Sequence, residues 1–148
     1  MKKTVILFVI FCTVLYSCII ESGGTANFKI INQTSHDIKI RITNYEYNST
    51  VPIDTIFFLP QNQQIERYFE KGGEGSEPFG WRIDNTAFII FNDSDTLFYT
   101  WQDNSPRNIL HKENYQKKIE EKSKRWTNYY YTYTFTEADY QNAVKGKK

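Results

Sequence analysis

Cysteine and histidine are scarce in this sequence, which has two of each among 148 residues. Cys12 lies inside an apolar run near the N-terminus and Cys18 follows that run, so we expect no disulfide and no cysteine-based metal site. His36 and His111 are too few for a zinc site, which needs three or four ligands at suitable spacing. We therefore expect neither a metal nor a cofactor.

Motifs that mark a catalytic site are also lacking. The sequence has no G-x-S-x-G elbow, and the run Ser35-His36-Asp37 cannot form a triad alone because neighbouring strand residues point to opposite faces. The turn at residues 92–95 ("NDSD") lacks the glycine and the glutamate of an EF-hand loop. We expect no catalytic residues. A saccharide-acting hydrolase with two carboxylates stays open, because sequence does not place carboxylates across a cleft.

The N-terminal segment, residues 1–17, has the pattern of an export signal. Lys2 and Lys3 precede an apolar run at residues 4–14, which is too short for a comfortable membrane-spanning helix. Removing this segment lowers the basic side chains from 18 to 16 (Lys2 and Lys3 are lost) against 17 acidic ones. That balance argues against a dedicated nucleic-acid binder, so we expect no nucleic-acid partner.

The residues Leu15-Tyr16-Ser17-Cys18 resemble the lipobox of bacterial lipoproteins, with Tyr16 bulkier than is usual at its place. The resemblance implies cleavage after Ser17 and acylation of Cys18 by diacylglycerol and a further chain such as palmitate. Two or three chains anchor stably, at about 0.8 kcal/mol per buried methylene. The residue after Cys18 is Ile19 and not the aspartate that resembles an inner-membrane retention signal. The resemblance therefore implies the outer membrane. Whether the domain faces the periplasm or the cell surface stays open.

Behind the cysteine, residues 18–26 are glycine-rich and are expected to form a flexible tether. Residues 27–148 are expected to form one domain. Alternating apolar and polar residues predict strands at 27–32, 37–43, 53–59, 64–69, 87–91, 96–101 and 128–135. Residues 107–125 fit a helix or an exposed strand, and we favour the strand. Thr136 followed by acidic residues predicts a short helix at 137–144.

Seven or eight such strands predict an all-β fold, an antiparallel β-sandwich of the immunoglobulin-like or a related kind. The runs "AFIIFNDSDTLFY", "NIL" and "YYYTYTFTEADYQNA" resemble small, uncharacterised envelope lipoproteins of the Bacteroides group. That resemblance implies an envelope lipoprotein with an all-β domain, and it implies no activity.

Aromatic residues are abundant, with three tryptophans, eleven tyrosines and eleven phenylalanines. Their rings stack on sugar faces, and they also pair with each other on half-buried strands, so a binding face and a core are both open. The candidate ligand-contacting residues are Trp81, Trp101, Tyr129, Tyr131 and Tyr133. The triplets Asp54-Thr55-Ile56 and Asp95-Thr96-Leu97 resemble O-glycosylation sites of exported Bacteroides-group proteins, which makes Thr55 and Thr96 candidates for modification.

These observations favour a lipid-anchored, non-catalytic module that binds a glycan or another envelope protein. The alternatives are a saccharide-acting hydrolase and a structural subunit of an envelope or fimbrial assembly, which would use an exposed sheet edge.

Overall fold

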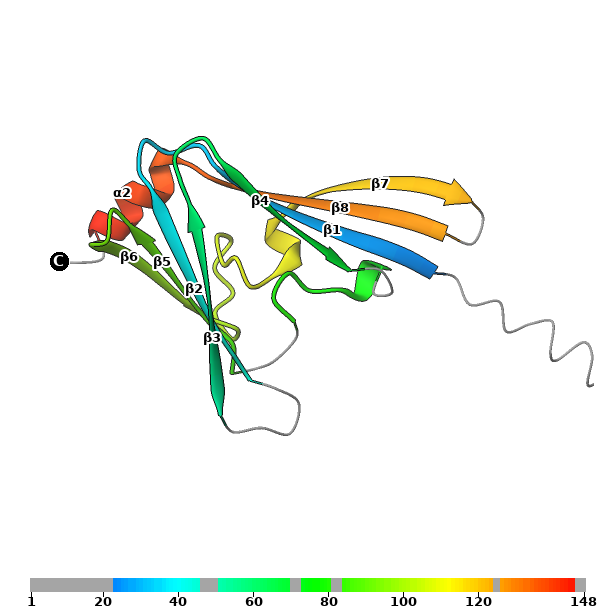
Figure 1. The fold of residues 1–148 in the computed structure, drawn as a ribbon, viewed down its shortest axis with the longest axis horizontal. Helices are drawn as coiled ribbons and strands as arrows, with labels where there is room; N and C mark the ends of the chain where they lie inside the picture. Colours follow the sequence, from blue (N-terminus) through cyan, green and yellow to red (C-terminus); the bar gives the residue numbers. More distant parts are fainter. Residues whose placement is uncertain (1–22, 46–50, 70–72, 81–83, 124–125, 146–148) are drawn as a thin grey trace, which may run out of the picture.

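The computed structural model describes residues 23–45, 51–69, 73–80, 84–123 and 126–145. They form a β-sandwich of two four-stranded sheets, together with one short C-terminal helix, as the sequence predicted (Figure 1). The elements are β1 (Gly23–Asn32), β2 (Ile38–Tyr45), β3 (Pro52–Leu59), β4 (Gln64–Phe69), η1 (Gly73–Gly75), β5 (Thr86–Phe91), β6 (Asp95–Thr100), η2 (Lys112–Asn114), β7 (Gln116–Ser123), β8 (Trp126–Phe135) and α2 (Glu137–Lys145).

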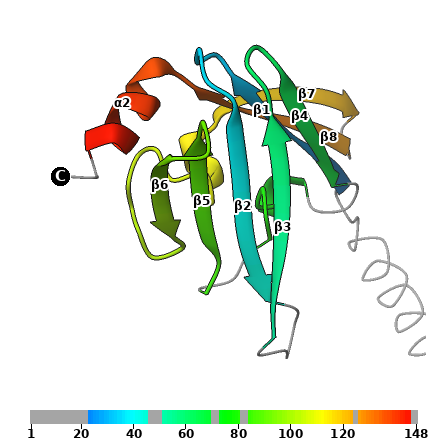
Figure 2. The same cartoon turned by 60° about the vertical axis from the view of Figure 1, so that its left-hand side comes forward.

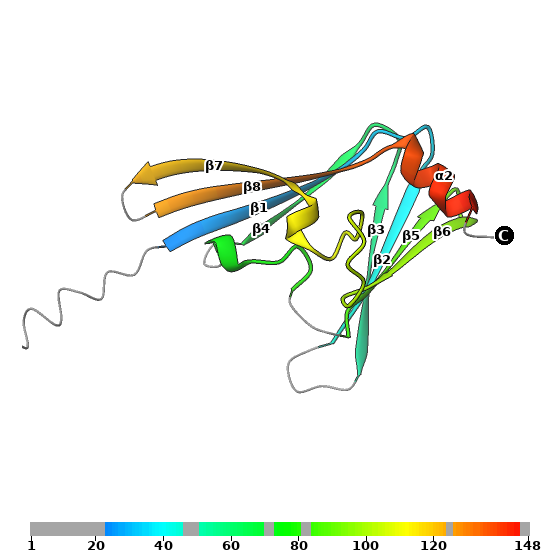
Figure 3. The same ribbon diagram turned by 180° about the vertical axis from the view of Figure 1, so that it is seen from behind.

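Sheet A has the strand order β4-β1-β8-β7, and sheet B has the order β3-β2-β5-β6. The sheets approach each other near α2 and diverge from there, and the segment that carries η2 lies between them (Figures 1 and 3). Ile109 and Leu110 of this segment are fully buried, so the space between the sheets is filled by chain and not by strands alone.

One strand pair departs from the antiparallel expectation. β1 pairs with β8 in parallel, whereas β1–β4, β2–β3, β2–β5, β5–β6 and β7–β8 are antiparallel. Sheet A is therefore mixed. For residues 107–125 the sequence favoured an exposed strand over a helix. The strand is confirmed at Gln116–Ser123, because β7 pairs with β8 in an antiparallel arrangement.

The expected tether is wrong for Gly23 to Ala26, which are the first residues of β1. Gly23 lies beside Trp126 of β8, and a Cβ atom at Gly23 would stand 2.4 Å from Trp126 Cζ3. The missing side chain thus makes room for an indole ring and does not loosen the chain. Thr25 then donates a hydrogen bond to Asn128 Oδ1 at 2.8 Å. Residues 18–22, including Cys18, lie outside the described part of the chain.

Strand β8 supplies much of the core. Tyr131, Tyr133 and Phe135 alternate along it and are at most 2% exposed. The Tyr131 ring stacks on Phe28 of β1, with centroids 4.8 Å apart and planes 11° apart. Tyr130, Thr132 and Thr134, which alternate with them on the other face, are half-buried, as the two-residue period of the sequence predicts.

Alkaline pH should weaken this fold through its buried phenols. Burial raises the pKa of Tyr99 to about 12, with a further contribution from Asp139. A tyrosine in the unfolded chain ionises near pH 10, so the native state retains a proton that the unfolded state has lost. The contribution of this phenol to the free energy of unfolding is therefore fully present below about pH 10 and is lost as the pH rises toward about 12. Urea midpoints across this range should show the fall, and Tyr99→Phe should reduce its slope; a flat profile would contradict it.

Candidate functional site

The four predicted aromatic residues that the structure describes do not lie together on one surface. Tyr131 and Tyr133 belong to the core, so their rings are not available to stack on a ligand. Tyr129 is half-buried on the same inward side of β8, with the Lys117 ammonium 5.1 Å from its ring centroid. Trp101 is half-buried against His111, with ring centroids 4.5 Å apart. Trp81 lies outside the described residues.

The two candidate glycosylation sites differ in accessibility. Thr55 is half-buried and lies opposite Ile42, which is a core residue. Thr96 is exposed on β6 and lies opposite Ile90 on the outer face of sheet B. A sugar needs solvent space, so Thr96 has the better position of the two.

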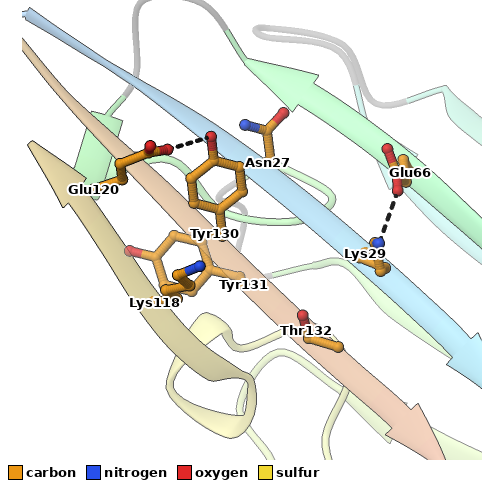
Figure 4. Close-up of a pocket in the computed structure, with 8 residues that line it drawn as sticks. All are labelled: Asn27, Lys29, Glu66, Lys118, Glu120, Tyr130, Tyr131 and Thr132. Atoms are coloured by element: carbon orange, nitrogen blue, oxygen red, sulfur yellow. Dashed lines mark hydrogen bonds and ion pairs between the residues drawn. The ribbon is translucent and has the colours of Figure 1, made fainter. Parts of the chain in front are cut away.

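The outer face of sheet A is the accessible side of these strands, and the alternate residues of the same strands build it. Because side chains alternate along a strand, Tyr130 and Thr132 point away from the buried Tyr131 and Tyr133. The register places Tyr68, Asn27, Tyr130 and Lys118 in one row across the four strands. A shallow groove of about 440 Å³ lies here. It is lined by Asn27, Lys29, Glu66, Lys118, Glu120, Tyr130, Tyr131 and Thr132 (Figure 4).

We call this surface the sheet A groove. Its polar side chains are held by their neighbours. Tyr130 Oη donates a hydrogen bond to Glu120 Oε2 at 3.0 Å, which orients the phenol ring on the surface (Figure 4). Lys29 Nζ lies 3.1 Å from Glu66 Oε1 on the neighbouring strand. The groove therefore offers several fixed hydrogen-bond donors and acceptors. Glu66 on the β4 side is paired with Lys29, and Glu120 on the β7 side is bonded to Tyr130.

Two further aromatic side chains lie on the same outer face. Tyr68 is 61% exposed and stands directly beside Asn27, while Trp126 is 37% exposed and covers Gly23. The strands of Tyr68 and Tyr130 are separated by β1 alone, which sets their backbones about 10 Å apart. Aromatic faces at both sides of a polar row suit a flat ligand with an apolar face and hydroxyl groups at its rim.

The groove's carboxylates are poorly placed for glycoside hydrolysis. Glu66 lies on β4 and Glu120 on β7, three strand spacings apart across the sheet and four residues apart along it, which separates their backbones by about 19 Å. Retaining and inverting glycosidases hold their two carboxyl groups about 5 to 9.5 Å apart. Each of these two carboxylates is, in addition, already engaged with a neighbouring side chain.

A second polar cluster joins the β1–β2 turn to the start of α2. Ser35 Oγ donates to Glu137 Oε1 at 2.6 Å, and this bond, with one from the Ser35 backbone N–H, lowers the pKa of Glu137. His36 Nε2 lies 3.6 Å from Glu137 Oε2, and its Nδ1 lies 2.7 Å from Asn92 Nδ2. The serine hydroxyl is thus bonded to the glutamate and not to the histidine, so the cluster ties segments together and forms no nucleophile–base pair.

Among the residues that the structure describes, no group of three or more histidine, cysteine, aspartate or glutamate side chains could hold a metal ion. None of the described helices is long and apolar enough to cross a membrane. No protein-family model, no curated protein and no solved structure matches this chain. The sheet A groove is therefore interpreted from its own geometry.

The predicted ligand-contacting residues Tyr129, Tyr131 and Tyr133 lie on the inward face of β8, whereas the candidate groove lies on its other face. Tyr129, Tyr131, Tyr133 and Phe135 are the larger and more apolar of the two alternating sets in β8, a pattern typical of a core. The set that begins at Tyr130 mixes one aromatic ring with threonines, a pattern typical of a wet face. The difference between the two sets distinguishes the core face of β8 from its accessible face. The position of Tyr68 beside Asn27 depends on the pairing of β4 with β1, which has no local signal in the sequence.

Proposed function

We propose that this chain is a lipid-anchored, non-catalytic binding module of a bacterial cell envelope, and that it binds a saccharide in the sheet A groove. The observation that carries the binding proposal is the row Tyr68, Asn27, Tyr130 and Lys118, which alternates rings with hydrogen-bonding groups across four strands. Tyrosine offers a face for stacking and a hydroxyl for orientation.

Charge within the groove supports a neutral or weakly charged ligand over a strongly ionic one. Lys29 is paired with Glu66, and Lys118 is balanced by Glu120 on the same strand. A site for a polyanion would present several unpaired cations instead. Hydroxyl groups of a sugar, which both donate and accept, suit a surface of mixed amide, phenol and carboxylate groups.

The lipid anchor is proposed from the N-terminal sequence. Metabolic labelling with a fatty-acid probe should mark the wild-type chain and leave Cys18→Ala unmarked. Labelling of both forms alike would remove the anchor from the proposal. Protease shaving of intact cells then decides which side of the outer membrane the domain faces.

Binding is tested on an array of neutral and acidic oligosaccharides. We expect the wild-type protein to be retained on a subset of neutral saccharides, and we expect Tyr130→Ala to lose that retention. Phe135→Ala, which removes a fully buried ring outside the groove, serves as the control for adhesion by misfolded protein. Retention no greater than that of the control, together with envelope pull-downs that return nothing, would refute the binding proposal.

A further inference from the structure

One edge of sheet B is apolar and carries little protection. β3 is the end strand of the sheet and is paired to β2 on one side, and no other described strand pairs with it (Figure 2). Its outward side chains Ile56 and Phe58 are 56% and 63% exposed. An exposed, apolar end strand is a template for pairing with another strand.

The other described end strands are protected in ways that β3 is not. β4 carries Glu66 and Arg67, and charged side chains on an end strand discourage pairing. β7 carries Lys117 and Lys118 among its first residues, and lysine on an end strand discourages pairing. α2 packs beside β6 (Figure 1). In β3 itself Asp54 is the only charged residue, and its carboxylate already accepts a hydrogen bond from Thr43 Oγ1 at 2.6 Å.

We propose that a second copy of this chain occupies the edge, with the two β3 strands antiparallel about a two-fold axis at Phe57. This pairing joins the two B sheets into one continuous sheet of eight strands, which lies within the usual size range. A closed two-fold dimer also removes both exposed edges at once, which an open-ended arrangement would not do. This interface lies on the opposite sheet from the groove and does not depend on the proposed saccharide.

The sequence of β3 selects that register. Residues opposite each other must point to the same face, so the two-fold axis must pass through one residue of the strand. An axis at Phe58 places Ile56 opposite the partner's Pro60, which has no N–H for the ladder. An axis at Thr55 places Ile56 opposite the partner's Asp54. An axis at Ile56 places Phe58 opposite the partner's Asp54. With the axis at Phe57, Ile56 faces the partner's Phe58 and Phe58 faces the partner's Ile56. Aromatic rings beside β-branched side chains are favourable cross-strand pairs.

The strand is also held in place before any partner binds. Phe57 points inward and packs against the core, with its ring centroid 5.9 Å from that of Phe79. Arg67 lies near both rings, with its guanidinium carbon 5.5 Å from the Phe57 centroid and 5.4 Å from the Phe79 centroid. A rigid edge loses little conformational entropy on pairing. Pro60, directly after the strand, has no N–H to extend the ladder and so limits it to about the five residues from Thr55 to Leu59.

Sedimentation velocity of the full-length chain, extracted from membranes in detergent, tests the dimer. We expect a dimer for the wild type, and we expect Phe58→Lys to raise the dissociation constant at least about tenfold, because it replaces the ring that faces the partner's Ile56 with a charge and sets two like charges at diagonal positions of the new strand pair. Phe98→Lys is the matched control, since Phe98 is 51% exposed on the same face of sheet B but lies on β6. A wild type that stays monomeric at every concentration would overturn the proposal.

Cross-linking in cells tests the register. Two differently tagged copies are co-expressed, one with Ile56→Cys and the other with Phe58→Cys, and we expect a disulfide between them. A pair with Thr96→Cys and Phe98→Cys on β6 should form none above the wild-type background. Cross-linking in the β6 pair alone, or capture of an unrelated protein by β3 in a chain that is itself monomeric, would overturn pairing with a second copy.

Discussion

Asp139→Ala is expected to lower the free energy of unfolding by about 3 kcal/mol, because it leaves the partly buried Arg107 guanidinium without its carboxylate partner. Arg107 Nε and Nη2 donate to Asp139 Oδ1 and Oδ2 at 2.7 and 2.6 Å. The Asp139 side chain is 3% exposed and that of Arg107 is 35% exposed, so the loss should lie at the lower end of the range for buried pairs.

The same carboxylate also caps α2. Asp139 Oδ2 accepts a hydrogen bond from the Thr136 backbone N–H at 2.8 Å, which is half of a capping box. Arg107 Nη2 donates to the Thr134 carbonyl at 2.6 Å, so the pair joins the segment between the sheets to β8 and the helix. Urea denaturation measures the loss. The exposed Gln141→Ala in α2 should change stability by less than about 0.5 kcal/mol, and a loss below about 1 kcal/mol for Asp139→Ala would contradict the account.

Tyr131→Ala is expected to lower the free energy of unfolding by about 3 to 5 kcal/mol, the usual cost of removing a large buried ring. Tyr131 is 2% exposed and stacks on Phe28. The neighbouring Tyr130→Ala should cost less than about 1 kcal/mol, because that ring lies on the outer face of sheet A.

Tyr131→Phe separates the ring from the hydroxyl. Tyr131 Oη is buried and has no hydrogen-bond partner in the structure, so its removal should leave stability unchanged or raise it. Thermal and urea denaturation of the three variants are compared at one pH. Equal losses for Tyr130→Ala and Tyr131→Ala would mean that the two faces of β8 are not divided into core and surface as described.

The strands could be predicted from sequence because their signal is local. Ile38, Ile40 and Ile42 alternate with polar residues, and all three are fully buried in β2. The start of α2 was equally local, since Thr136 and the acids behind it are a sequence signature of a helix N-terminus. Period and capping are properties of a few adjacent residues, so no knowledge of the partner strands was needed.

The parallel pairing of β1 with β8 could not be predicted, because it joins segments about a hundred residues apart. It decides the environment of Gly23, which sequence reasoning assigned to a tether and which instead lies under Trp126. The sheet A groove depends on the same long-range register. Its four strands come from three separate parts of the chain, so neither Tyr68 beside Asn27 nor Glu66 beside Lys29 has a local signature.

The proposed binding face is tested most directly by titrating an oligosaccharide retained on the array against two variants of adjacent residues. Tyr130 lies in the sheet A groove, whereas Tyr129 lies on the opposite face of the same strand. We expect Tyr130→Ala to weaken binding at least about tenfold, which corresponds to about 1.4 kcal/mol, while Tyr129→Ala retains wild-type affinity. Loss of binding in Tyr129→Ala with full binding in Tyr130→Ala would contradict the assignment of the groove as the site.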